Sequence, residues 1–328
     1  MDKRFKILGV GSPLVDNLAR VEDDFLAGIG GAKGGMELIE ADGVQTILGR
    51  LEAAVDRIAG GSAANTVTAL ARLGVASTFL GKVGSDEAVD VYLDGFRTAG
   101  VDVSRFKRHA TTPTGQCLCL ITPDSERTCR TFLGAAGTLT PEELSPADFA
   151  DVEHVHIEGY MLFNQDLAWA LLKTAREAGC RISLDLASFE VVHANRDIMD
   201  EILAEYVDMV FANEEESAAY CGSESPETGL AALARHCDTA VVKIGAKGAW
   251  LQSGTEQARV EAEVVEAIDT TGAGDLWAAG FLFGVFAEHD LATCGRLGAR
   301  LGAEVVQVLG AGITDERWQQ LKKELHQT

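Results

Sequence analysis

The segment EAIDTTGAGDLWAAGF, residues 266–281, places Gly272, Ala273 and Gly274 between an extended stretch and an apolar run with helical character. Glycines at such a junction let backbone N–H groups converge. The N-terminus of the following helix adds unsatisfied donors and a partial positive charge. The segment therefore predicts an anion-binding loop, with the carboxylate of Asp275 at its rim.

A carboxylate beside a bound phosphate is repulsive unless it has a chemical task. Asp275 suits one task, the removal of a proton from a hydroxyl that attacks phosphorus. The helix N-terminus is expected to lower the pKa of Asp275, which weakens the base, but phosphoryl transfer depends more on positioning than on base strength. The alternative is that Asp275 only caps the helix.

Composition limits the classes of function. The chain has 328 residues, 47% of them hydrophobic, enough for one large α/β domain or a domain with a small appendage. A formal net charge of −22 argues against nucleic-acid and anionic-membrane partners. Seven scattered cysteines without a CxxC pair indicate a reduced, cytoplasmic protein. The N-terminus is typical of a first strand and not of a signal peptide, and the longest apolar run is too short to span a bilayer.

Strands and helices are expected to alternate along most of the chain, which predicts a parallel sheet flanked by helices. Ligands in such folds bind outside the carboxyl ends of the strands, at Gly159, Asp185, Asn213 and Gly245. Residues 17–50 are glycine-rich and expected to be irregular. Residues 114–134 are expected to form a hairpin that turns at Pro123-Asp124-Ser125. Both segments are assigned to a small β appendage. The predicted strands are 6–11, 77–84, 154–160, 181–186, 207–212 and 239–244, and the predicted helices are 61–74, 86–100, 166–179, 197–206 and 213–221.

Several motifs together resemble the ribokinase-like (PfkB) family of sugar and nucleoside kinases. They are DTTGAGD (269–275), GGSAANTVTALARLG (60–74), GKVGSDE (81–87) and VDMVFANEEE (207–216). Within the family the chain is most similar to the adenosine kinase branch, through GSPLVD (11–16), TGQCLCLIT (114–122) and HIEGYMLF (156–163). The resemblance implies a single domain over 1–328, a three-layer α/β/α sandwich with a mostly parallel central sheet. It also implies a small β-sheet lid from about 14–50 and 112–135.

The resemblance also implies roles for individual residues. Asp275 would be the catalytic base, with the backbone of Gly272, Ala273 and Gly274 as the anion hole. Asn213 and Glu216 would organise Mg²⁺ and phosphate, with Glu216 reaching the metal through water. The residues implied to bind the substrate are Ser12, Asp16, Gly60, Gly61, Asn65 and Cys117, and those implied to bind the nucleotide are Asn213, Glu216, Lys243, Gly245, Gly248 and Thr270.

Each motif also has a purely structural interpretation. Asn213 with Glu216 is a capping box, Asp16 follows Pro13 in a possible turn, and Gly60-Gly61 can serve only as a helix entrance. His154 and His156 share one strand face with no third ligand nearby, which favours a packed or surface pair over a zinc site. The chain has no GxxxxGK[ST] motif, and its GVGSPL segment (9–14) is an incomplete dinucleotide fingerprint.

The predicted activity is transfer of the γ-phosphate of ATP to a primary hydroxyl of a ribosyl-type substrate, with Mg²⁺. The resemblance leaves a requirement for a monovalent cation open. The first candidate substrate is adenosine, giving AMP, and the second is a free sugar such as ribose or fructose. Ser12, where adenosine kinases tend to have Asn, and the weakly aromatic Tyr160-Met161 pair leave other nucleosides open. A non-catalytic nucleotide-binding regulator is the hypothesis of another class. The protein is expected to be a monomer or a homodimer.

Overall fold

The computed structural model describes residues 4–51, 55–124 and 126–327. Within these residues, the larger of the sheets has eight strands. It is parallel except at one edge, where two strands run antiparallel to their neighbours. In spatial order the strands are β15 (Glu256–Val260), β14 (Ala249–Ser253), β13 (Thr239–Lys243), β12 (Met209–Asn213), β11 (Arg181–Asp185), β10 (Val152–Glu158), β1 (Phe5–Val10) and β5 (Ser77–Leu80).

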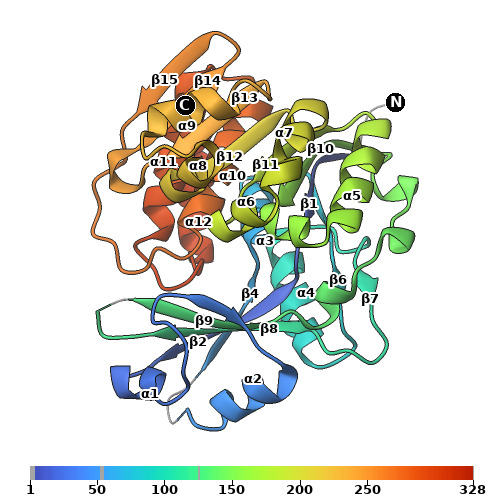
Figure 1. The fold of residues 1–328 in the computed structure, drawn as a ribbon, viewed down its shortest axis with the longest axis vertical. Coiled ribbons are helices and arrows are strands. Elements are labelled where there is room, and N and C mark those ends of the chain that lie inside the picture. The colour runs from blue at the N-terminus through green and yellow to red at the C-terminus, as the bar shows by residue number, and fades with distance from the viewer. Residues whose placement is uncertain (1–3, 52–54, 125, 328) are drawn as a thin grey trace.

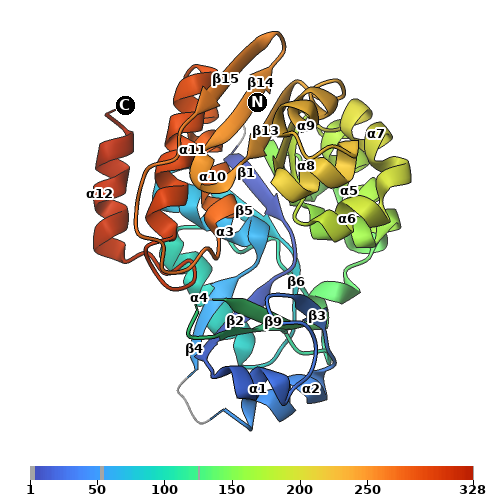
Figure 2. The same ribbon diagram turned by 60° about the vertical axis from the view of Figure 1, so that its left-hand side comes forward.

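Helices cover both faces of this sheet and give the α/β/α sandwich that the sequence predicted (Figure 2). The strands alternate their side chains between two hydrophobic cores: Ile7, for example, packs into one core and Leu8 into the other. One face carries α3 (Ser62–Arg72), α4 (Ala88–Ala99), α10 (Ala273–Phe286), α11 (Leu291–Val305) and α12 (Asp315–Leu325). The other face carries α5 (Gln165–Glu177), α6 (Phe189–Ala194), α7 (Arg196–Glu205), α8 (Glu214–Cys221) and α9 (Pro226–Leu233).

A small mixed sheet lies below the sandwich in Figure 1. Its spatial order is β3 (Met36–Leu38), β9 (Arg127–Phe132), β8 (Gly115–Ile121), β2 (Leu14–Arg20) and β4 (Asp56–Gly60). Leu118 and Leu120 point to the outer face, where they pack against α1 (Asp23–Ala27) and α2 (Ala41–Leu48). Because side chains alternate along a strand, Cys117 and Cys119 lie on the opposite, inner face.

Two predictions of local structure were wrong. Residues 17–50 are not irregular, because they contain α1, α2 and β3, and the buried Val44 and Ile47 of α2 pack beneath the small sheet. Residues 77–84 are not one strand: β5 ends at Leu80, and β6 (Lys82–Val83) pairs with β7 (Lys107–Arg108) in a separate sheet. The break falls at Gly81, where a side chain would collide with Pro13.

The hairpin predicted over 114–134 is confirmed as the antiparallel pair β8–β9, although Ser125 of its turn lies outside the described residues. The other predicted strands and helices are present with small shifts at their ends. Short 3₁₀ turns occupy Gly134–Thr138, Pro141–Glu143, Pro146–Asp148, Gly159–Phe163 and Gly245–Lys247. Across the described part of the chain, every helix is too short or too polar to cross a membrane.

Candidate active site

A cavity of about 1140 Å³ lies between the carboxyl ends of the large sheet's strands and the inner face of the small sheet. This is the position at which ligands bind in open parallel sheets. Nearly all the residues assigned to a site from the sequence line this cavity. They are Ser12, Asp16, Gly61, Asn65, Cys117, Asn213, Glu216, Lys243, Gly245, Gly248, Thr270, Gly272, Ala273, Gly274 and Asp275.

Gly60 is the exception, since it is buried next to the cavity without lining it. A side chain at Gly60 would meet the carboxylate of Asp16 at 2.3 Å, and the carbonyl of Gly60 accepts a hydrogen bond from Tyr92. The absence of a side chain at Gly60 therefore leaves room for the carboxylate of Asp16. Gly61 lines the cavity with φ of 104°, a conformation that disfavours other residues.

The predicted anion-binding loop is held by a buried carboxylate. Asp269 accepts hydrogen bonds from the backbone N–H and the hydroxyl of Thr271 and from the N–H of Gly310. Gly272 is the N-cap residue of α10 and has φ of 74°. The N–H of Ala273 donates to the carbonyl of Thr270 at 3.1 Å, so Ala273 is not a free donor here. The assignment of Gly272, Ala273 and Gly274 to an anion hole stays a prediction, in which the amide of Ala273 also closes an internal turn.

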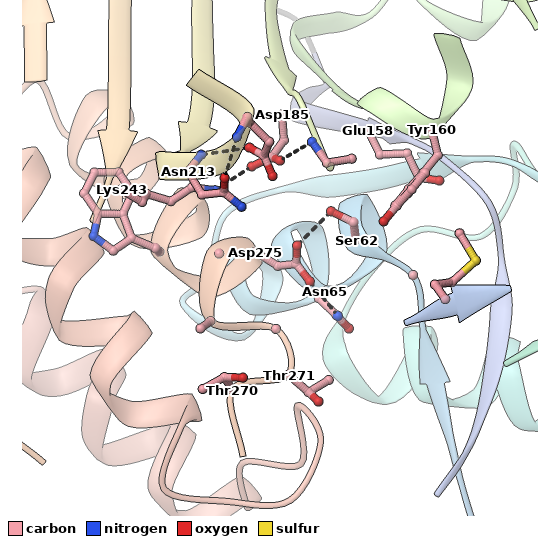
Figure 3. Close-up of a pocket in the computed structure, with 18 of the residues that line it drawn as sticks. Ser62, Asn65, Glu158, Tyr160, Asp185, Asn213, Lys243, Thr270, Thr271 and Asp275 are labelled. Carbon is pink, nitrogen blue, oxygen red and sulfur yellow. Dashed lines mark hydrogen bonds and ion pairs between the residues drawn. The ribbon is translucent and has the colours of Figure 1, made fainter. Parts of the chain in front are cut away.

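Asp275 lies in the first turn of α10 and is held from α3 (Figure 3). The hydroxyl of Ser62 donates to one of its carboxylate oxygens at 2.7 Å, and the amide of Asn65 donates to the other at 2.8 Å. Burial raises the pKa of Asp275 to about 6, although both hydrogen bonds oppose the rise. The expectation that the helix N-terminus would lower the pKa was wrong, because desolvation outweighs the helix dipole.

The small sheet brings a second carboxylate into the cavity. Asp16, on β2, lies beside Cys117 in the parallel β2–β8 register. Burial raises the pKa of Asp16 to about 7, and the nearby guanidinium of Arg127 opposes this rise. Arg127 also donates to the hydroxyl of Thr271 at 2.5 Å, which ties the small sheet to the anion-binding loop.

Glu158 ends β10 and supports the segment next to Asp16. Its carboxylate accepts hydrogen bonds from the backbone N–H of Ser12 at 2.7 Å and of Ala63 at 3.2 Å. Burial raises the pKa of Glu158 to about 7. Glu158 thus joins the strand that leads to Asp16 to the helix that carries Ser62 and Asn65.

The opposite end of the cavity is rich in charged groups. Lys243 donates to the carboxylate of Asp185 at 2.8 Å, and both side chains are buried. Asn213 and Glu216 form the capping box of α8, with both reciprocal hydrogen bonds at 2.8 Å. Burial, aided by the charge of Asp185, raises the pKa of Glu216 to about 7. The capping interpretation of this pair is therefore confirmed, while its side chains still line the cavity.

Sequence reasoning missed the site roles of Ser62, Arg127 and Glu158. Ser62 directly follows Gly61 at a helix N-terminus, a position that could have drawn attention to it. Asp185 was noted only as a strand end. Glu158 lies at the end of a predicted strand directly before Gly159, a position that could have drawn attention to it. Arg127 has no local sequence feature that marks it. The histidine pair is packed as expected: His154 and His156 both bond the hydroxyl of Ser183 at 2.8 Å.

Comparison with known proteins identifies the family. Residues 36–318 match the pfkB family of carbohydrate kinases, and the chain belongs to that family. The protein is therefore an ATP-dependent sugar or nucleoside kinase, a phosphotransferase with an alcohol acceptor.

Relatives of the chain differ in their activities. The solved structure of adenosine kinase from Sinorhizobium meliloti is 32% identical, with a TM-score of 0.89 and 99% of each chain covered. Adenosine kinase of Saccharomyces cerevisiae is 28% identical over 94% of this chain and 96% of its own. ATP-dependent ribose-1-phosphate kinase of Halopiger xanaduensis is 30% identical over 80% of this chain and 88% of its own.

Proposed function

We propose that this pfkB-family kinase transfers the γ-phosphate of ATP to the primary hydroxyl of a ribonucleoside, with adenosine as the first candidate and AMP as the product. The observation that carries the chemistry is the carboxylate of Asp275, fixed by Ser62 and Asn65 beside the anion-binding loop. A carboxylate in that place accepts the hydroxyl proton as the hydroxyl attacks phosphorus. Its pKa of about 6 leaves it mostly ionised at neutral pH.

Asp16 and Arg127 would position the acceptor. Carboxylate oxygens only accept hydrogen bonds, so Asp16 suits the vicinal hydroxyls of a ribose. Arg127 is anchored by its hydrogen bond to Thr271, which would hold its guanidinium at the border between the small sheet and the loop. The small sheet would act as the lid that excludes water during transfer.

The donor set at the far end of the cavity fits Mg²⁺. Glu214, Glu215 and Glu216 line the wall together with Asn213 and Asp185, and all of them offer the oxygen ligands that Mg²⁺ prefers. Asn213 and Glu216 would hold the ion through water, and the ion would neutralise charge on the phosphates. Lys243 supplies a fixed positive charge in the same wall.

An apolar wall supports a nucleoside over a free sugar. Met36, Leu38 and Phe163 line the cavity and are 47%, 62% and 55% exposed. Phe163 stacks on Tyr160, with ring centroids 6.5 Å apart. A free sugar carries hydroxyls on every side and needs polar partners, whereas a flat base covers apolar side chains.

The second candidate is a sugar kinase with the same catalytic machinery. It is favoured by the 30% identity to ribose-1-phosphate kinase over most of the chain. In that case Asp16 and Asp275 keep their roles. The apolar wall of Met36, Leu38 and Phe163 would then make no contact with a base.

ADP release from Mg-ATP tests the proposal, with adenosine, inosine, guanosine, cytidine, ribose, ribose 1-phosphate and fructose as separate acceptors. Saturable turnover with adenosine, with KM between about 1 μM and 1 mM, is the expected result. Turnover only with a sugar would reject the nucleoside and keep the chemistry. Turnover with none of these acceptors would contradict the proposed substrate class.

A further inference from the structure

Three cysteine sulfurs meet on the inner face of the small sheet. Cys117 and Cys119 are two positions apart on β8 and point the same way. Cys129 of β9 lies directly opposite Cys119 in the antiparallel register. The three sulfurs lie within 4.8 Å of one another, and those of Cys117 and Cys119 are 3.6 Å apart. This cluster, called the thiol triad below, is brought together by the strand register.

The thiol triad is enclosed on one side and borders the cavity on the other. Leu18, Ile58 and Ile121 pack around it. Cys117 and Cys129 also line the cavity, whereas Cys119 is fully buried behind them. An ion held by the three sulfurs would therefore keep one coordination position facing the cavity, the arrangement of an open zinc site.

The spacing suits a small soft cation. Zinc binds thiolate at about 2.3 Å in tetrahedral geometry, which places two sulfurs on one ion roughly 3.8 Å apart. The observed separations of 3.6 Å to at most 4.8 Å need only small side-chain adjustments. Soft thiolates favour zinc over the hard cation Mg²⁺ that a kinase uses with ATP.

A positive charge lies next to the thiol triad and would stabilise thiolate at this place. The guanidinium of Arg127, whose side chain is anchored on the neighbouring Thr271, lies against the sulfur of Cys129. The Nε of Arg127 lies 3.1 Å from the sulfur of Cys129. Three thiolates with one Zn²⁺ carry a net charge of −1, which the guanidinium of Arg127 offsets. Each thiol of the triad that binds Zn²⁺ loses its proton to solvent.

We propose that Cys117, Cys119 and Cys129 form a zinc site on the inner face of the small sheet, and that its occupation blocks the acceptor end of the cavity. Asp16 lies beside Cys117 in the β2–β8 register, so an ion on the thiol triad stands next to the carboxylate assigned to the acceptor. Zinc inhibition is accordingly expected to compete with the acceptor and not with ATP. That competition rests on the proposed function, whereas metal binding itself does not.

Metal binding is tested directly on the reduced full-length protein under anaerobic conditions. Titration with Co²⁺ is expected to produce a sulfur-to-cobalt charge-transfer band that saturates near one ion per chain and is bleached by Zn²⁺. The decisive variant is Cys119→Ser, because Cys119 does not line the cavity. Cys221→Ser is the matched control, since Cys221 is partly exposed at the end of α8.

The variants distinguish the outcomes. Cys119→Ser is expected to lose the band and to weaken Zn²⁺ binding by at least about 100-fold, because even an outer partner of a metal site is worth 10–100-fold. Cys119→Ala is expected to show the same loss of the band and of Zn²⁺ affinity. Thermal melting checks that both variants are folded. An unchanged band in both, or no band in the wild type, overturns the zinc site.

Activity assays then separate the two parts of the inference. With any acceptor that turns over, Zn²⁺ should raise the acceptor KM of the wild type and of Cys221→Ser, but not of Cys119→Ser. If Zn²⁺ instead raised the KM for ATP and left the acceptor KM unchanged, the proposal that Zn²⁺ blocks the acceptor end would be contradicted. If no acceptor turns over, the proposed function fails, while the cobalt titration still decides the metal site.

Discussion

The side-chain amide of Asn65 donates a hydrogen bond to the carboxylate of Asp275 over 2.8 Å, across 210 positions of the chain. Ser62 donates to the other oxygen of the same carboxylate. The glycine-rich start of α3 and the glycine-rich start of α10 thus converge on one carboxylate. Both oxygens of Asp275 are oriented before any substrate binds, which is the preorganisation that a general base requires.

Replacing Asp275 with Asn should nearly abolish turnover. The amide keeps the shape of the side chain but cannot take a proton, so kcat is expected to fall by about 10²–10⁴-fold or more. ATP binding, measured by calorimetry, should stay within about three-fold, because the anion-binding loop is intact. Asp290→Asn is the control: Asp290 caps α11 away from the cavity lining, and Asn caps equally well. Near-normal kcat in Asp275→Asn would refute the assigned role.

The pH dependence of kcat/KM should show an acidic limb to which this base contributes, together with Asp16 at the acceptor end, whose pKa burial raises to about 7. Asp275 must be ionised to act, and burial raises its pKa to about 6, so activity is expected to rise with pH through this region. Ser62→Ala removes a hydrogen bond that favours the ionised form and should move the limb to higher pH. Ser85→Ala, at an exposed position, should leave the limb in place. A limb that shifts down or stays fixed in Ser62→Ala would exclude Asp275 as its source.

Site features that depend on a local sequence motif could be predicted, whereas those that depend on packing between distant elements could not. The strand–glycine–helix pattern at Asp275 is local, and therefore its element and its place in the cavity were predictable. The pKa of Asp275 was not, because it depends on burial by distant elements. The same holds for Arg127, which reaches the cavity only through tertiary packing. The helix α2 escaped prediction because it is only eight residues long and contains Gly43, and its amphipathic face is covered only by the small sheet.

Asp16→Asn should stabilise the protein at alkaline pH. The pKa of Asp16 is raised from 3.8 to about 7 in the folded chain, chiefly by burial. Between these values the folded chain keeps a proton that the unfolded chain has lost, so this contribution to stability falls as pH rises from about 4 to about 7. The neutral Asn escapes that loss, which is worth at most roughly 4 kcal/mol at 1.36 kcal/mol per pKa unit.

Urea unfolding without ligand at pH 5 and pH 8 measures this effect. The stability difference between Asp16→Asn and the wild type should grow toward pH 8. Asp90→Asn, on the exposed face of α4, serves as the control and should show no such growth. A difference that is equal at both pH values would show that the carboxyl of Asp16 is not destabilised by burial.

The apolar wall gives the sharpest test of substrate class. Met36 and Leu38 are two positions apart on β3, and both line the cavity while remaining largely exposed to solvent. If a base covers on the order of 60 Å² of them, the loss in Met36→Ser/Leu38→Ser is about 1.5 kcal/mol at ~25 cal/mol per Å². The nucleoside KM should then rise roughly ten-fold with kcat little changed, because the base lies far from the reacting atoms. Val91→Ser, an exposed apolar position on α4 outside the cavity lining, should leave KM unchanged. An unaltered nucleoside KM in the double variant would remove the apolar wall as the reason to favour a nucleoside over a sugar.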